Sequence, residues 1–286
     1  MSHPVLLERI LRWAQAHEQA RALVLTGSMA QPGARIDPLS DLDLELVVHD
    51  VAAMMATGPW WAELGEVWAT QVVDAFAAAS TQAYPLVGVI YAGGATVDFT
   101  LIDAARFTEM ARIQQLDRVY APGYRVLWDP DGVAGGLPAA AEPGPASQPS
   151  LTQQELRAVA DAFWFEALRV PKYLIRGELW EAKSREWTMK QHLLLLIEWH
   201  AAVLTGRPLD EYRKGRHLSR WADPWVWQEA HEVFGRFDAA DSWRAFLASV
   251  ALFNRLAGET AGEAGLRYPS PADEAITEHL RALAAR

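Results

Sequence analysis

The residues that decide the fold are LVLTGSMA at positions 23–30 and SDLDLEL at positions 40–46. They predict an apolar strand, a tight turn with a short helix, and then a second strand that opens with two carboxylates. Side chains of a strand alternate between its two faces, so Asp41 and Asp43 project from one side and the neighbouring leucines from the other. Two like charges this close repel each other, and a divalent cation is the usual means of holding them together. The second strand therefore predicts a metal site.

The turn between these strands predicts a binding site for phosphate. Gly27 can adopt backbone angles that a side chain would forbid. Ser28 then presents its N–H and hydroxyl groups where the short helix begins, which is a common place for an anion to bind. Together with the two carboxylates, this turn suggests a nucleoside triphosphate that is bound with magnesium.

A third carboxylate occurs on a later strand. Asp98 lies in VDFTLI, residues 97–102, where it shares one face with Thr100 while apolar residues take the other. Residues 86–102 predict a strand, a glycine turn and a strand, and such a hairpin beside the first acidic strand brings Asp98 to the metal. The alternative is that all three aspartates are solvated polar positions, but three matched elements in order favour the metal site.

These elements resemble the pattern of the nucleotidyltransferase superfamily that includes DNA polymerase beta: Gly-Ser, then Asp-x-Asp, then a third acid on a later strand. Within it, the chain is most similar to the streptomycin (aminoglycoside 6-) adenylyltransferases, over most of its length. The resemblance implies ATP as co-substrate, one or two Mg²⁺ ions held by the three aspartates, and resistance to an antibiotic. Ser40, which precedes the acidic pair in the motif, is assigned with Gly27 and Ser28 to nucleotide binding.

The composition excludes several classes of protein. The 286 residues include no cysteine, which excludes disulfides, zinc–thiolate sites and thiol nucleophiles. A formal net charge of −10 disfavours a nucleic-acid polymerase, which needs a basic track for the phosphate backbone, and suits a cationic acceptor instead. No signal peptide and no apolar run of membrane-spanning length is evident, so we expect a cytoplasmic protein that binds neither membrane nor nucleic acid. The oligomeric state stays open, with a monomer as the expectation.

Three regions follow one another along the chain. Residues 1–133 predict a nucleotidyltransferase domain that combines helices with a mixed sheet. Residues 134–150 are rich in proline, glycine and alanine, which is typical of a linker. Residues 151–286 show helical patterns throughout and predict an acceptor-binding domain. The expected fold class is therefore α+β: an N-terminal α/β domain followed by an all-α helical-bundle domain.

Two local patterns refine this outline. Residues 51–79 are expected to be mostly helical, because the aromatic and apolar residues between positions 60 and 68 recur at helical spacing. Thr152 and Glu155 form the pattern of a capping box, which predicts that the first helix of the second domain begins there.

The helical domain carries aromatic and acidic residues close together. Aromatic residues at helical spacing are more often core, and a single carboxylate is more often a solvated helix face. As a group lining a cleft, these aromatic and acidic residues would suit a polycationic sugar. The resemblance implies that residues of this domain form part of the acceptor pocket. The expected acceptor-binding residues are Trp164, Glu166 and Glu178. Lys214 and Arg216 lie in a segment that resembles a basic element of the family and are expected to reach the triphosphate; the alternative is a solvated basic loop.

The leading hypothesis is adenylyl transfer from MgATP to a hydroxyl group of a small cationic acceptor, such as a streptomycin-like aminoglycoside. Asp41, Asp43 and Asp98 are the expected catalytic and metal-binding residues, with Asp98 as the candidate general base. One alternative keeps this chemistry but transfers the nucleotide to another small molecule or to a protein side chain, as a toxin would. Another alternative is a non-catalytic sensor that binds nucleotide, because a fold does not decide its function.

Overall fold

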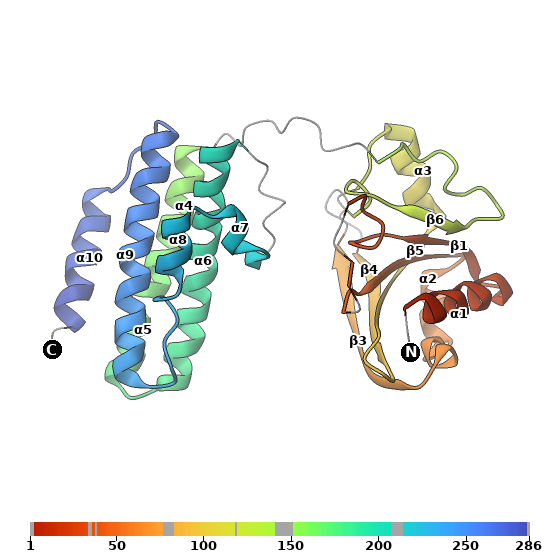
Figure 1. Ribbon diagram of the computed structural model, residues 1–286, viewed down its shortest axis with the longest axis horizontal. Helices are drawn as coiled ribbons and strands as arrows, with labels where there is room; N and C mark the ends of the chain where they lie inside the picture. The colour runs from red at the N-terminus through yellow and green to blue at the C-terminus, as the bar shows by residue number, and fades with distance from the viewer. Residues whose placement is uncertain are drawn as a thin grey trace. The chain divides into compact units, whose positions relative to one another are not determined.

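The structure is a computed structural model that describes residues 3–33, 36–37, 39–76, 83–117, 119–140, 151–206 and 214–284. The chain divides into two compact units, Met1–Gly144 and Pro145–Arg286. The first combines a sheet with helices, whereas the second is helical throughout the residues that are described (Figure 1). The expected α+β fold class is therefore confirmed.

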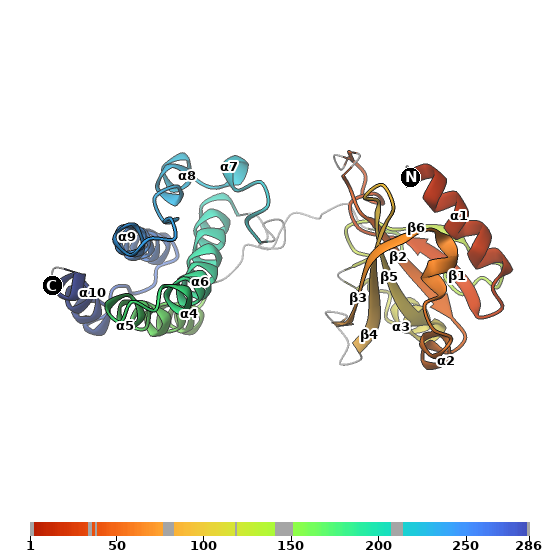
Figure 2. The same ribbon diagram turned by 90° about the horizontal axis from the view of Figure 1, so that it is seen from below.

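A six-stranded sheet forms the centre of the first unit, in the order β3-β4-β5-β2-β1-β6. The strands are β1 (Ala20–Leu25), β2 (Leu42–Val48), β3 (Val67–Phe76), β4 (Ala83–Tyr91), β5 (Thr96–Asp103) and β6 (Arg125–Trp128). Strands β2 and β5 pair in parallel, and the other neighbours pair antiparallel, so the sheet is mixed as expected. Strands β3 and β4 lie on the side of the unit away from the N-terminal helix (Figure 2).

Helices cover the two faces of this sheet unequally. Helices α1 (His3–Ala16) and α2 (Val51–Ala56) and the short 3-10 helix η1 (Trp60–Leu64) pack on one face, over the buried leucines of β1, β2 and β5. Helix α3 (Ala104–Ile113) packs on the other face, where Phe107 and Met110 are buried against the sheet (Figure 1). Asp103 caps α3 by accepting a hydrogen bond from the backbone N–H of Arg106 at 3.3 Å.

Two expectations for this unit are wrong. Residues 67–76 form strand β3 rather than a continuation of a helix, because their β-branched residues pair along β4. The aromatic spacing between positions 60 and 68 belongs instead to η1 and the start of β3. Residues 28–30 form turns rather than a helix, with the N–H of Ala30 bonded to the carbonyl oxygen of Gly27 at 3.2 Å.

The second unit is a bundle around α4 (Gln153–Ala167), α6 (Leu179–Thr205) and α9 (Ala239–Glu263). Helix α6 packs against both of its neighbours, and the ring of Phe163 stacks on that of Phe253 at 3.8 Å between centroids. The predicted capping box of Thr152 and Glu155 is present at the start of α4. The remaining helices are α5 (Val170–Ile175), α7 (Leu218–Trp221), α8 (Pro224–Ala230) and α10 (Pro271–Ala284).

The segment expected to be a linker begins as part of the first unit. Ala134 is buried in the core beneath α3, and its N–H donates to the carboxylate of Asp129 at 2.9 Å. The hydroxyl of Tyr124 donates to the carbonyl oxygen of Pro138 at 2.9 Å. Residues 134–138 thus pack on the sheet unit, while residues 141–150 lie outside the described part of the chain.

Candidate active site

Two of the three predicted aspartates lie side by side on neighbouring strands. Asp43 of β2 and Asp98 of β5 are direct partners in the parallel register, so their side chains leave the same face of the sheet. Asp41 lies two residues before Asp43 and faces the same side. The leucines and valines that alternate with them are buried on the opposite face, as the sequence predicts. The sheet therefore brings together all three acidic side chains that the motifs indicate.

The turn after β1 supports the carboxylate of Asp43. Thr26 donates its backbone N–H to the carbonyl oxygen of Asp43 at 2.9 Å, which ties the turn to β2. Gly27 follows with φ at +63°, a conformation that favours glycine. A Cβ atom at position 27 would lie 1.8 Å from the Oδ2 atom of Asp43. The carboxylate thus occupies the space that the missing side chain of Gly27 leaves.

Burial and charge act together on Asp98. Asp41 is exposed, whereas Asp43 and Asp98 are half-buried. Partial burial raises the pKa of Asp98 above its ordinary value, and the negative charge of Asp41 raises that pKa further. Asp98 and Asp41 are therefore close enough for their charges to interact.

The three aspartates suit an open magnesium site better than a site in which protein ligands enclose the ion. Within the described ranges, no three acidic or imidazole side chains converge tightly enough to enclose an ion. Magnesium prefers oxygen ligands, keeps several waters, and is usually bound by one or two carboxylates together with the phosphates of a substrate. The pair Asp43–Asp98 with Asp41 beside it, and the cradle at Gly27, fit that kind of site.

A fourth acid on the same face was missed by the sequence analysis. Glu45 lies two residues after Asp43 and is 2% exposed; its carboxylate accepts a hydrogen bond from Arg106 of α3 at 3.1 Å. Arg106 also donates to Asp117 at 2.7 Å, and its guanidinium lies over the rings of Tyr84 and Tyr120, 5.2 Å from each centroid. Burial raises the pKa of Glu45 to about 7, although Arg106 opposes this shift. The alternation along β2 could have indicated Glu45, but only the fold supplies its partner on α3.

Ser40 stabilises the turn that leads into β2. Its hydroxyl accepts a hydrogen bond from the N–H of Asp37 at 3.0 Å, and its own N–H donates to the carbonyl oxygen of Asp37 at 3.0 Å. Ser28 lies half-buried in the turn after Gly27. Ser28 follows Gly27, which contacts Asp43, and Ser40 directly precedes Asp41. The predicted role of both serines in nucleotide binding stays a prediction.

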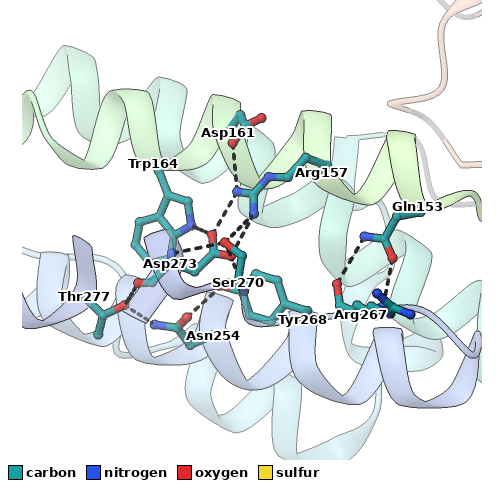
Figure 3. A network of polar contacts seen from close by, with 10 residues as sticks. All are labelled: Gln153, Arg157, Asp161, Trp164, Asn254, Arg267, Tyr268, Ser270, Asp273 and Thr277. Atoms are coloured by element: carbon teal, nitrogen blue, oxygen red, sulfur yellow. Dashed lines mark hydrogen bonds and ion pairs between the residues drawn. The ribbon is translucent and has the colours of Figure 1, made fainter. Parts of the chain in front are cut away.

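Two of the acceptor-binding residues expected in the helical unit are buried inside it. Trp164 is 2% exposed in the core of the bundle, and its indole N–H donates to Asp273 at 2.6 Å (Figure 3). Glu166 is also buried and pairs with Arg169 at 3.1 Å and with Arg185 at 3.6 Å. The structure thus gives both residues partners inside the bundle.

The other three expected residues of this unit are exposed. Glu178 precedes α6, and Lys214 and Arg216 lie in the segment before α7. Lys214 has φ at +50°, and the carbonyl oxygen of Arg216 accepts a hydrogen bond from the indole of Trp221 at 2.7 Å. Their side chains are on the surface of the unit, as ligand-binding or merely solvated residues would be.

Almost the whole chain matches one known protein family. Residues 2–283 match the family described as streptomycin adenylyltransferase. The chain belongs to the streptomycin adenylyltransferase family. This adenylyltransferase is accordingly an enzyme, a nucleotidyltransferase.

Individual relatives of the adenylyltransferase are distant. The aminoglycoside 6-adenylyltransferase of Bacillus subtilis (strain 168) is 20% identical over 291 residues, which cover 99% of this chain and 98% of that protein. A crystal structure of an aminoglycoside 6-adenyltransferase from Bacillus subtilis has a TM-score of 0.45 at 18% identity, with 98% of each chain covered. A nucleotidyltransferase-like protein from Exiguobacterium sibiricum 255-15 has a TM-score of 0.34 at 10% identity, covering 89% of this chain and 73% of that one.

Within the described residues, none of the helices of this adenylyltransferase is both long enough and apolar enough to span a bilayer.

Proposed function

We propose that this adenylyltransferase transfers AMP from MgATP to a hydroxyl group of an aminoglycoside and releases pyrophosphate. The observation that carries the proposal is the pair Asp43–Asp98 on parallel strands, with Asp41 beside it and the Gly27 turn beneath. Membership of the family, and the distant relative named for an aminoglycoside acceptor, support the choice of acceptor. The formal net charge of −10 also suits a polycationic substrate.

The roles of the residues follow from where they lie. Asp41, Asp43 and Asp98 would hold one or two Mg²⁺ ions, which would neutralise the negative charge on the phosphates. The turn of Gly27 and Ser28 positions the β- and γ-phosphates of ATP with its backbone N–H groups and hydroxyl.

The transfer itself exchanges one bond for another. The acceptor oxygen forms a bond to the α-phosphorus, and the bond from that phosphorus to the oxygen bridging to the β-phosphate breaks in line. Pyrophosphate leaves with the bonding electron pair. Asp98 takes the proton of the acceptor hydroxyl, because it lies in the centre of the sheet face beside Asp43 and is half-buried.

The helical unit contributes residues whose side chains are on its surface. Lys214 and Arg216 are proposed to bind phosphates of the nucleotide, and Glu178 to bind an ammonium or guanidinium group of the acceptor. No substrate role is proposed for Trp164, whose indole N–H already donates to Asp273, or for Glu166, which is buried and paired with Arg169 and Arg185.

Incubation with MgATP and a panel of aminoglycosides tests this function, with pyrophosphate release and product mass as the two readouts. An increase in acceptor mass equal to one adenylyl group is the expected result. The Asp43→Asn variant is the matched control, since it keeps the side-chain volume and removes a metal-binding charge. If no aminoglycoside gains mass while ATP binds, the acceptor belongs to another class, and a protein side chain becomes the next acceptor to test.

A further inference from the structure

The row of aspartates continues across the sheet toward its edge. Asp98 of β5 pairs with Gly88 of β4, and Gly88 pairs in turn with Gln71 of β3. Residues paired in this way have side chains on the same face, and neighbouring strands lie about 4.8 Å apart. Asp43, Asp98, Gly88 and Gln71 thus form one straight row across four strands. The row runs from two carboxylates, over a residue without a side chain, to an exposed amide.

Gly88 has no conformational reason to be glycine. Its φ lies outside the left-handed region, unlike that of Gly27, so other residues could adopt its backbone angles. Glycine inside a strand weakens the strand and often marks a place where a ligand or another backbone approaches closely. A Cβ atom at position 88 would lie 3.1 Å from the Oδ1 atom of Asp98, which is a tight contact. Gly88 therefore leaves the side of the Asp98 carboxylate open.

Among the described residues, the surface around Gly88 is partly open and partly apolar. Val73 and Ile90 belong to the same face, and each is 39% exposed. The packing under α3 reaches only the far end of β4, where Tyr84 is 4% exposed and lies against Arg106. Apolar surface between a few placed polar groups is typical of sites that bind a sugar or another ring by its face.

We propose that the surface over Gly88, between Asp98 and Gln71, is the subsite that seats one amino-sugar or aminocyclitol ring of the acceptor. The ring lies over Gly88 with Ile90 and Val73 beside it. Its reacting hydroxyl points to Asp98, and a hydroxyl or ammonium group on its opposite edge bonds to the carboxamide of Gln71. This inference rests on the proposed function, because it identifies which part of the sheet the acceptor meets.

Three variants test the subsite. Gly88→Ala places a methyl group where the ring lies, so the KM for streptomycin should rise about tenfold or more, as for a single misplaced methyl group in a pocket. Gln71→Ala removes one hydrogen bond and should raise that KM by a few-fold. Thr70→Ala is the matched control, because Thr70 is exposed on the same strand but pairs with Val89 and faces the other side of the sheet. The KM for ATP should stay unchanged in Gln71→Ala and Thr70→Ala, which do not touch Asp98, and thermal unfolding checks that each variant is folded.

Calorimetric titration with streptomycin, without nucleotide, separates this inference from the proposed function. If the wild-type enzyme binds streptomycin but transfers no AMP to it, the proposed function fails, and the variants still decide the subsite. Weaker binding by both Gly88→Ala and Gln71→Ala than by Thr70→Ala supports the subsite, with or without turnover. Binding by Gln71→Ala equal to that by Thr70→Ala, or no binding of any aminoglycoside by the wild-type enzyme, overturns it.

Discussion

The Gly27→Ala variant should lose most of its transfer activity while it remains folded. A methyl group at position 27 would lie 1.8 Å from Oδ2, 2.5 Å from Cγ and 2.9 Å from Cβ of Asp43. Real Cβ atoms essentially never approach another atom within 3.0 Å, so Oδ2 must retreat by at least 1.2 Å. Rotation of the Asp43 side chain moves Oδ2 and Cγ but leaves its Cβ in place, so the turn must also shift. A displacement of about 1 Å at a reacting centre costs on the order of a hundredfold in rate.

The same variant also places alanine in a left-handed conformation. With φ at +63°, this strain costs roughly 1–2 kcal/mol of folding free energy. Gly33→Ala is the matched control: Gly33 has φ at +74°, but a Cβ atom there would meet nothing within 4 Å. Both variants carry the same kind of strain, and only one of them displaces Asp43.

Pyrophosphate release with MgATP and the best acceptor measures the activity, and thermal unfolding measures the stability of both variants. Similar melting temperatures with activity lost only in Gly27→Ala are expected. The reasoning is refuted if the two variants have activities within a few-fold of each other while both are folded. The Asp43 carboxylate would then not depend on the space at position 27.

Four further outcomes are expected. Asp43→Asn should remain folded and lose transfer activity, because the metal loses a charged ligand while the side-chain volume hardly changes; activity near that of wild type contradicts the site. Asp98→Ala should abolish turnover but retain much of the affinity for a non-hydrolysable ATP analogue in calorimetry. A loss of that affinity would show instead that Asp98 is chiefly a metal ligand. The apparent affinity for streptomycin should fall as ionic strength rises, more than that for ATP, because exposed charges are screened. Asp273→Asn should lower stability by about 2 kcal/mol at neutral pH: burial raises the pKa of this carboxyl, but hydrogen bonds from Arg157 and Ser270 outweigh it and lower the pKa from 3.8 to about 2 (Figure 3). The stabilisation is present above pH 4 and disappears as pH falls toward 2, so denaturant unfolding of the two proteins should converge there.

Local patterns in the sequence were sufficient for much of the fold and for the acidic motif. Alternation along residues 41–46 and 97–101 places apolar side chains in the core and three aspartates on the opposite face, because the period of a strand is two. The capping box at Thr152 depends on residues three apart, which a sequence shows directly. Such features need no knowledge of distant partners.

Features that depend on distant residues were decided only by the tertiary structure. Residues 67–76 became a strand because β4 offered them a partner, and that pairing placed Gln71 in line with Gly88 and Asp98. Trp164 had the residue type of a ligand-binding position, but Asp273, more than a hundred residues later, accepts its N–H in the core. Arg106 likewise meets Glu45 from a different element. Intrinsic strand preferences of residues span only about 1 kcal/mol, so strand pairing and burial override them. The residues that pair with a strand or bury a side chain come from distant parts of the sequence.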